Sequence, residues 1–199
     1  MPTLSPVETP VEMDSPRPRP SIFDGGPEHA STDAIVIPRR RWLSAGYTYQ
    51  RITFGQLRAL VDQRAAGLQQ RGIGRGDRIV LLAPFGGEFI TLVFAIMRTG
   101  ATLVLVDPGM GLRPALQCLS EVEPDGFVAV ARAHAIRWWN QRMFPKSRWH
   151  VTVGRGGFGT PSAAFEELAP GDYQPVKLVP SDSAAIIFTS GSTGVAKGV

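Results

Sequence analysis

The chain has little of what secreted and membrane proteins depend on. Its 199 residues include one cysteine, Cys118, so no disulfide can form within the chain and a reducing compartment is expected. No apolar run approaches the roughly 18 residues that a membrane-spanning helix needs. The N-terminal segment also lacks the apolar stretch of a secretory signal. Together these absences favour a cytoplasmic protein without a membrane span.

Patterns that bind metals or nucleic acids are also missing. The three histidines, His29, His134 and His150, have neither the spacing of metal ligands nor cysteines beside them. The net charge is +4, and much of it comes from single arginines spread along the chain. The densest basic run, Arg39-Arg40-Arg41, precedes Trp42, but three arginines in one loop more often form a solvated turn than a nucleic-acid site. We therefore expect no metal site in this chain and no nucleic-acid partner.

What remains is the composition of a globular domain. Apolar residues make up 43% of the chain and charged residues 19%, which is enough apolar material for a sizeable core. Residues 1–20 are rich in proline and are expected to form a disordered leader. Residues 21–199 are expected to form the folded part, in which Cys118 is a small buried core residue.

Helix and strand patterns alternate along this folded part. In the clearest helix, 53–71, Thr53 and Gln56 form a capping-box pattern at the start and Gly72 follows the end. Residues 102–106 form a continuous apolar run, as expected for a strand covered on both faces. The other expected helices are 88–99, 113–121 and 134–143, and the other expected strands are 34–37 (ended by Pro38), 49–52, 78–82, 126–130, 149–153 and 184–188.

This alternation predicts an α/β fold with layered, mainly parallel sheets flanked by helices, because right-handed helical crossovers join consecutive parallel strands. Residues 39–49 are expected to form a hairpin loop, and residues 154–180 to be mostly loop. Ligands of such sheets bind at the carboxyl ends of the strands. A binding site is therefore expected where a strand ends.

The last expected strand, 184–188, runs into a loop of hydroxyls and glycines that closes with a lysine. The sequence of this loop, residues 189–198, is TSGSTGVAKG. Its glycines let backbone N–H groups approach an anion, and its hydroxyls can donate hydrogen bonds to phosphate oxygens. Lys197 adds a mobile positive charge. This combination after a buried strand indicates a phosphate-binding loop rather than a flexible Ser/Gly linker.

The loop does not have the G-x-x-x-x-G-K-[ST] pattern of a P-loop. Counted from Gly191, the second glycine would fall on Ala196, and Lys197 is followed by Gly198 instead of Ser or Thr. Residues 189–198 instead resemble the signature T-S-G-[ST]-T-G-x-P-K-G of AMP-forming adenylate synthetases, the superfamily of acyl-CoA synthetases, peptide-synthetase adenylation domains and luciferases. Ala196 replaces the usual proline, which removes no hydrogen-bond donor. A weaker, fold-level likeness extends over roughly residues 22–199.

The resemblance implies a reaction of ATP with a carboxylic acid. A substrate carboxylate would attack the α-phosphorus of Mg-ATP and form an acyl-adenylate and pyrophosphate. The loop would then bind the polyphosphate, and Lys197 would be the catalytic residue that neutralises the leaving pyrophosphate. The nucleotide-binding residues implied are Thr189, Ser190, Gly191, Ser192, Thr193, Gly194 and Lys197.

A second resemblance concerns residues 106–111, VDPGMG, together with Leu116, Leu119 and Glu123-Pro124. This stretch is similar to the β-lactone synthetases of long-chain olefin biosynthesis and to their fatty acid CoA ligase relatives. In the first group the β-hydroxyl of the substrate would attack the activated carbonyl, and in the second the thiol of coenzyme A would attack it. The sequence does not decide between a β-lactone product and a coenzyme A thioester product.

The superfamily likeness also implies that this chain is a fragment. Members continue for several hundred residues after the loop, and their adenine-binding, Mg²⁺-binding and C-terminal lysine positions lie in that part. We therefore expect residues 21–199 to be the truncated N-terminal portion of an AMP-binding domain, inactive or nearly so alone. The alternative is a non-catalytic module that binds a nucleotide or phosphate. The sequence indicates neither the acyl substrate nor the oligomeric state.

Overall fold

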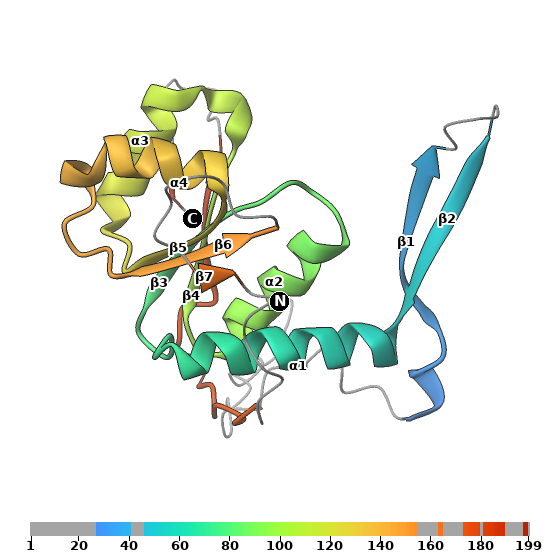
Figure 1. Cartoon of the computed structure of the whole chain (residues 1–199). Helices are drawn as coiled ribbons and strands as arrows, with labels where there is room; N and C mark the ends of the chain where they lie inside the picture. The colour runs from blue at the N-terminus through green and yellow to red at the C-terminus, as the bar shows by residue number, and fades with distance from the viewer. Residues whose placement is uncertain are drawn as a thin grey trace, which may run out of the picture.

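The structure, a computed structural model, describes residues 27–40, 46–154, 163–164, 173–179, 181–189 and 197–198. Among these residues, a mainly parallel β-sheet has helices on both faces, and a separate two-stranded ribbon stands beside it (Figure 1). The expected leader, residues 1–20, lies outside the described residues.

The order of the strands in the sheet differs from their order in the chain. In space the strands are β7 (Ala163–Ala164), β6 (Trp149–Val153), β5 (Gly126–Val130), β3 (Arg78–Leu82), β4 (Thr102–Val106), β8 (Ala185–Thr189) and β9 (Lys197–Gly198). Neighbouring strands are parallel except β8 and β9, which are antiparallel. The prediction of a mainly parallel sheet is confirmed, and β3 to β6 have the predicted bounds. The last predicted strand is displaced by one residue.

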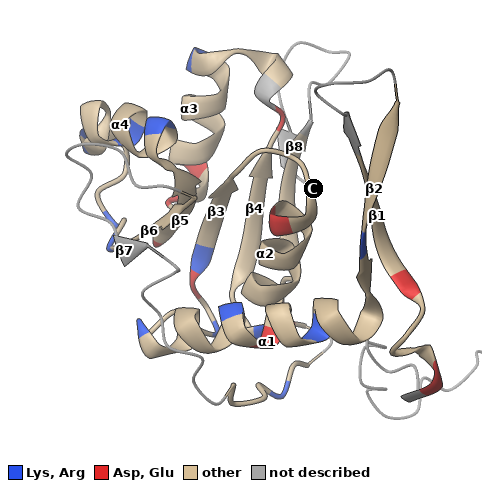
Figure 2. Cartoon of the chain, turned by 45° about the vertical axis from the view of Figure 1, so that its right-hand side comes forward, with Lys and Arg blue, Asp and Glu red and all other residues tan. Residues whose placement is uncertain are grey.

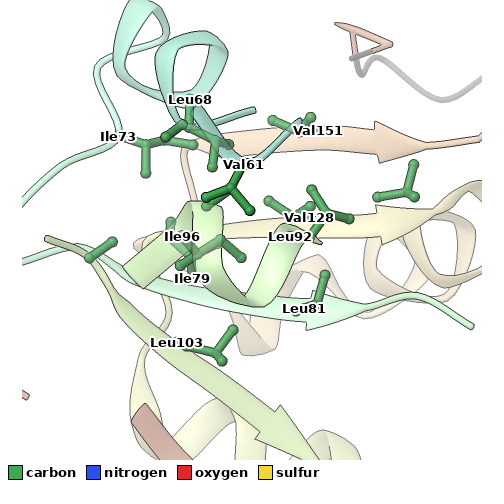
Figure 3. Packing of buried hydrophobic residues seen from close by; sticks show 14 of the residues in the cluster. Val61, Leu68, Ile73, Ile79, Leu81, Leu92, Ile96, Leu103, Val128 and Val151 are labelled. Atoms are coloured by element: carbon green, nitrogen blue, oxygen red, sulfur yellow. The ribbon is translucent and has the colours of Figure 1, made fainter. Parts of the chain in front are cut away.

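Alternation of side chains along β3 produces a core on each face of the sheet. Ile79 and Leu81 pack with residues of α1 (Phe54–Gln70) and α2 (Gly87–Arg98), and Figure 3 shows this first core. Val80 points to the opposite face and packs with residues of α3 (Leu112–Val122) in the second core. Cys118 is 5% exposed within that second core, so its prediction as a small buried residue is confirmed.

The long helix α1 begins and ends where the sequence predicts. Thr53 Oγ1 accepts a hydrogen bond from the Gln56 N–H at 3.3 Å, and Gln56 Oε1 accepts one from the Thr53 N–H at 3.0 Å. This reciprocal pair is the predicted capping box. The helix ends before Gly72, whose φ of +81° is a conformation that side chains with a Cβ rarely adopt. The apolar face between these ends, which includes Leu57 and Val61, is buried in the first core.

The ribbon of β1 (Asp33–Arg40) and β2 (Tyr47–Thr53) corrects the predicted loop 39–49. The strand does not end at Pro38, because Pro38 pairs with Tyr49 inside the ribbon. In a two-stranded ribbon each strand has a free edge, and proline is tolerated there because its missing N–H need not serve a partner. Arg39 and Arg40 therefore belong to β1 and not to a solvated turn, and the ribbon stands apart from the main sheet (Figures 1 and 2).

The helix predicted at 134–143 is found at α4 (Ala131–Trp139), followed by the short 3₁₀ turn η3 (Gln141–Met143). It begins directly after β5, without a side-chain cap that would mark its start in the sequence. It ends at Asn140, whose backbone N–H and side-chain amide both bond the Ile136 carbonyl. Asn140 thus satisfies a carbonyl that the next helical turn would have used. Two more short 3₁₀ turns are η1 (Pro27–His29) and η2 (Pro108–Met110).

The capping box yields the first testable expectation. Replacing Thr53 by Ala removes the hydroxyl that satisfies a free N–H of the first helical turn, which typically costs about 1 kcal/mol. We expect urea denaturation of Thr53→Ala to give a free energy of unfolding lower by about that amount. The matched control is Thr53→Ser, which keeps the hydroxyl and is expected to stay within a few tenths of a kcal/mol of the wild type. Equal losses in both variants would contradict the assigned cap.

Candidate functional site

The predicted phosphate-binding loop starts and ends on two paired strands. Thr189 is the last residue of β8, Lys197 is the first residue of β9, and the two are backbone partners. The connecting segment 190–196 therefore leaves the carboxyl end of β8 and returns to the same end. The predicted residues Ser190, Gly191, Ser192, Thr193 and Gly194 lie outside the described residues.

The turn after β4 lies at the base of this loop. Val106 pairs with Phe188, and the Asp107 N–H donates to the Phe188 carbonyl at 3.3 Å. The Asp107 Oδ1 accepts a hydrogen bond from the Gly109 N–H at 2.7 Å, which closes the turn. The parallel pairing of β4 with β8 brings this turn next to the loop.

A cavity of about 750 Å³ opens at the same edge of the sheet. It lies at the carboxyl ends of β3, β4, β5 and β8, and its wall also includes residues of α3 and α4 and Phe89 from the first turn of α2. Most of its wall is apolar, as with Leu116, Phe144 and Ile187. Its size falls in the range of small-molecule sites. The sequence does not reveal this cavity, because its wall is assembled from segments between residues 81 and 188.

Three basic side chains, those of His134 and Arg137 on α4 and of His150 on β6, lie close together near this cavity. His134 is buried, and its Nε2 lies 2.9 Å from the Val151 carbonyl. His150 Nε2 lies 3.0 Å from Ser147 Oγ, and the two imidazole rings are 6.2 Å apart between centroids. Arg137 lies on the same helix one turn after His134 and lines the cavity.

Burial keeps the two histidines neutral. Burial lowers the pKa of His134, and the Arg137 charge lowers it further, against an opposing effect of the Val151 carbonyl. Burial, the charge of Arg137 and the charge that His134 carries when it is protonated lower the pKa of His150 to about 4. The proximity of His134, His150 and Arg137 was not predicted from the sequence. The sequence signal for part of this proximity is the spacing of His134 and Arg137, which lie three residues apart in α4 and therefore share one helix face.

The Cys118 thiol faces the same core but has no reactive character. Burial raises the pKa of Cys118, and the Glu121 charge raises it further. A thiol with a raised pKa is a poor nucleophile at neutral pH, because the thiolate is the reactive form. Cys118 is therefore a packing residue.

The fold defines a class of α/β proteins in which ligands bind at the carboxyl ends of parallel strands. Comparison with known proteins narrows this class. Residues 30–199 match the family model described as AMP-binding enzyme, and the chain belongs to that family.

Curated relatives include two olefin β-lactone synthetases. The one from Stenotrophomonas maltophilia is 44% identical over 171 residues, which cover 83% of this chain and 31% of the relative. The one from Xanthomonas campestris pv. campestris is 42% identical over 170 residues, which cover 83% of this chain and 30% of the relative. The L-proline–[L-prolyl-carrier protein] ligase of Streptomyces coelicolor is 31% identical over 161 residues, which cover 74% of this chain and 29% of the relative. The chain thus spans about a third of the length of these relatives.

Solved structures confirm the fold. The long-chain-fatty-acid-CoA ligase from Archaeoglobus fulgidus matches with a TM-score of 0.62 and 20% identity, over 81% of this chain and 31% of that chain. MbtA from Mycobacterium smegmatis matches with a TM-score of 0.63 and 27% identity, over 75% of this chain and 28% of that chain. Among the described residues, no helix is both long enough and apolar enough to cross a membrane.

The neutral state of His150 predicts a loss of stability in acid. Its pKa is about 4 in the folded chain and 6.5 in the unfolded chain, so the unfolded chain takes up the proton first. The contribution of neutral His150 to the free energy of unfolding is fully present above pH 6.5. It is lost as the pH falls toward 4, and the loss is at most about 3 kcal/mol. Urea denaturation across this range should show a steeper decline for the wild type than for His150→Gln. The control is His29→Gln, an exposed site; a His150→Gln profile as steep as the wild type would contradict the assignment.

Proposed function

We propose that this chain carries the phosphate-binding part of an ATP-dependent, AMP-forming ligase that activates a carboxylic acid. The observation that carries the proposal is the loop 189–198: its sequence matches the synthetase signature in a member of the AMP-binding family, and its ends pair at the carboxyl edge of a parallel sheet. A non-catalytic nucleotide-binding module is the alternative, and it has no separate observation in its favour.

The proposed first step makes an acyl-adenylate. A carboxylate oxygen attacks the α-phosphorus of ATP, the bond to the β-phosphate oxygen breaks, and pyrophosphate leaves with the released negative charge. Hydrogen-bond donors aimed at that charge lower the barrier. The proposed donors are the hydroxyls and backbone N–H groups of Thr189, Ser190, Gly191, Ser192, Thr193 and Gly194. Lys197 then neutralises pyrophosphate as it departs.

The proposed second step closes a β-lactone. The β-hydroxyl oxygen of the acyl group attacks the activated carbonyl, the bond to AMP breaks, and the hydroxyl proton is released. Identity of 42–44% with two olefin β-lactone synthetases supports this branch over attack by coenzyme A. The substrate class that follows is a β-hydroxy fatty acid.

ATP would bind together with Mg²⁺, which reduces repulsion between the incoming carboxylate and the phosphates. No residue of this chain is assigned to the ion. We also propose a cytoplasmic location, which fits a chain with a single, buried cysteine.

The loop assignment predicts a loss of catalysis on substitution of Lys197. Removing one donor that binds developing charge typically costs about 3 kcal/mol, which is a rate about a hundredfold lower. We expect Lys197→Ala to lower carboxylate-dependent pyrophosphate–ATP exchange by that factor in the whole encoded protein, and Thr193→Ala combined with it to lower exchange further. The control is Lys177→Ala, at an exposed lysine outside the loop. Unchanged exchange and ATP affinity in the double variant would refute the assignment, whereas ATP binding without exchange would favour the non-catalytic module.

An assay without coenzyme A tests whether the product is a β-lactone or a coenzyme A thioester. Incubation of the whole protein with ATP and a long-chain β-hydroxy acid should give a product lighter than the acid by one water, detected by mass spectrometry. The matched acid that lacks the hydroxyl should give no such product, because the nucleophile is missing. Strict dependence of turnover on coenzyme A would place the protein in the thioester branch instead.

A further inference from the structure

The outer side of α4 is apolar and aromatic. In the part of the chain that the structure describes, Trp139 is 83% exposed and Ile136 is 38% exposed, whereas His134 and Arg137 are buried. Residues three or four apart share a helix face, so Arg132, Ile136 and Trp139 lie along the outward side. A surface helix normally presents its polar side to water and its apolar side to the core. In α4 this distribution is reversed, and Figure 1 places the helix at the edge of the molecule, on the side opposite to the ribbon.

The exposed apolar surface continues past the end of this helix. Trp138 is 56% exposed, and its ring meets that of Trp139 edge to face, with the centroids 6.3 Å apart. Met143 in η3 is 36% exposed. A single exposed apolar side chain is ordinary, but a group that includes two tryptophans indicates an interaction surface. We call this surface the α4 patch, and its members are Arg132, Ile136, Trp138, Trp139, Arg142 and Met143, all of them exposed.

The charge of the segment that contains the α4 patch has one sign. Residues 126–165 hold six of the 21 basic residues of the chain and none of its 17 acidic residues, so the segment has a charge of +6 and the rest of the chain a net charge of −2. Figure 2 shows basic but no acidic positions on α4. Arg132 and Arg142 are the basic members of the patch itself, on either side of the two tryptophans in the sequence. A partner of this surface is therefore expected to be negatively charged.

Two other basic side chains of the segment are already held by carboxylates of the protein. Lys146 Nζ lies 2.6 Å from an oxygen of Glu123, and Arg148 Nη2 lies 2.6 Å from an oxygen of Asp77. Neither lysine nor arginine of these pairs belongs to the α4 patch. The patch combines its own two arginines with its apolar and aromatic side chains.

An anionic lipid surface matches every member of the patch. Tryptophan rings favour the headgroup level of a bilayer, where the ring leaves water and its N–H stays hydrated. Side chains such as Ile136 and Met143 enter the boundary of the acyl chains, and arginines attract anionic headgroups. A nucleic acid would bind the arginines through phosphates and stack bases on aromatic rings, but it offers no apolar medium for Ile136 and Met143. The composition of the patch therefore favours lipid over nucleic acid.

We propose that the α4 patch binds the protein to the surface of a membrane that contains anionic phospholipids. Trp139 and its apolar neighbours enter the headgroup region, and Arg132 and Arg142 contact the lipid phosphates. Binding of this kind is peripheral, needs no membrane-spanning segment, and weakens as salt screens the charges. The proposal goes beyond the proposed ligase activity and does not depend on it.

Flotation of the whole encoded protein with vesicles tests the charge requirement. One set of vesicles contains phosphatidylcholine alone, and the other contains phosphatidylcholine and phosphatidylglycerol in equal amounts. We expect the mixed vesicles to bind at least about tenfold more tightly at low salt, because each arginine near an anionic surface contributes about fivefold. Arg142→Gln should weaken binding to the mixed vesicles about fivefold. The matched control, Lys177→Gln at an exposed lysine outside the patch, should leave it unchanged.

The aromatic contribution is tested with Trp139→Ala. We expect this variant to bind the mixed vesicles about tenfold more weakly, because a large apolar side chain that leaves water contributes at least about that factor. The control is Tyr47→Ala, at an aromatic residue of the ribbon that is 63% exposed. Absence of vesicle binding in the wild type, unchanged binding in both Trp139→Ala and Arg142→Gln, or binding to a single-stranded oligonucleotide in place of vesicles would overturn the proposal.

Tryptophan fluorescence of the whole protein tests whether Trp139 is the residue that meets the lipid. Without vesicles, iodide should quench a part of the emission that is missing in Trp139→Phe. With vesicles, brominated phosphatidylglycerol should quench the same part, and iodide should no longer reach it. Shielding of Trp139 from iodide before vesicles are added would mean that another part of the protein covers the patch, which overturns the proposal. Pyrophosphate exchange is measured without vesicles and should be the same in these variants as in the wild type, so failure of membrane binding leaves the proposed function standing.

Discussion

The pairing of β8 between β4 and β9 is the constraint on which the site depends. The parallel ladder to β4 places the carboxyl ends of both strands at one edge, and the antiparallel pair Thr189–Lys197 turns the chain back at that edge. A loop held at both ends can present several backbone N–H groups toward one point, because its ends cannot separate. An anion-binding loop without such anchors would lose more conformational entropy on binding.

The sheet also explains why two kinds of interior coexist in one small chain. One face is covered by α1 and α2, and Leu68 and Ile79 are completely buried in its core. At the carboxyl edge of the sheet, by contrast, residues of α3, α4 and the start of α2 surround a cavity, and Arg137 is part of its wall. In the described part of the chain, the carboxyl edge of the sheet therefore has room for a ligand.

Much of the fold could be predicted because its signals are local. The capping box at Thr53, the glycine at Gly72 and the apolar runs of β3 to β6 depend on neighbours within a few residues. The errors arose where tertiary contacts decide. Pro38 is tolerated because it lies on a ribbon edge, and α4 starts early because β5 leads straight into it. Neither an edge nor a direct strand-to-helix junction has a signature in residue type.

The sequence by itself determined the alternation of strands and helices and the chemistry of the loop 189–198, because periodicity and residue type are properties of short segments. Only the tertiary structure decided that this loop begins and ends on paired strands, that the Asp107 turn lies at its base, and that Arg137 lines an apolar cavity. Those relations join residues that are distant in the chain, and they exist because the crossovers place β5, β3, β4 and β8 side by side.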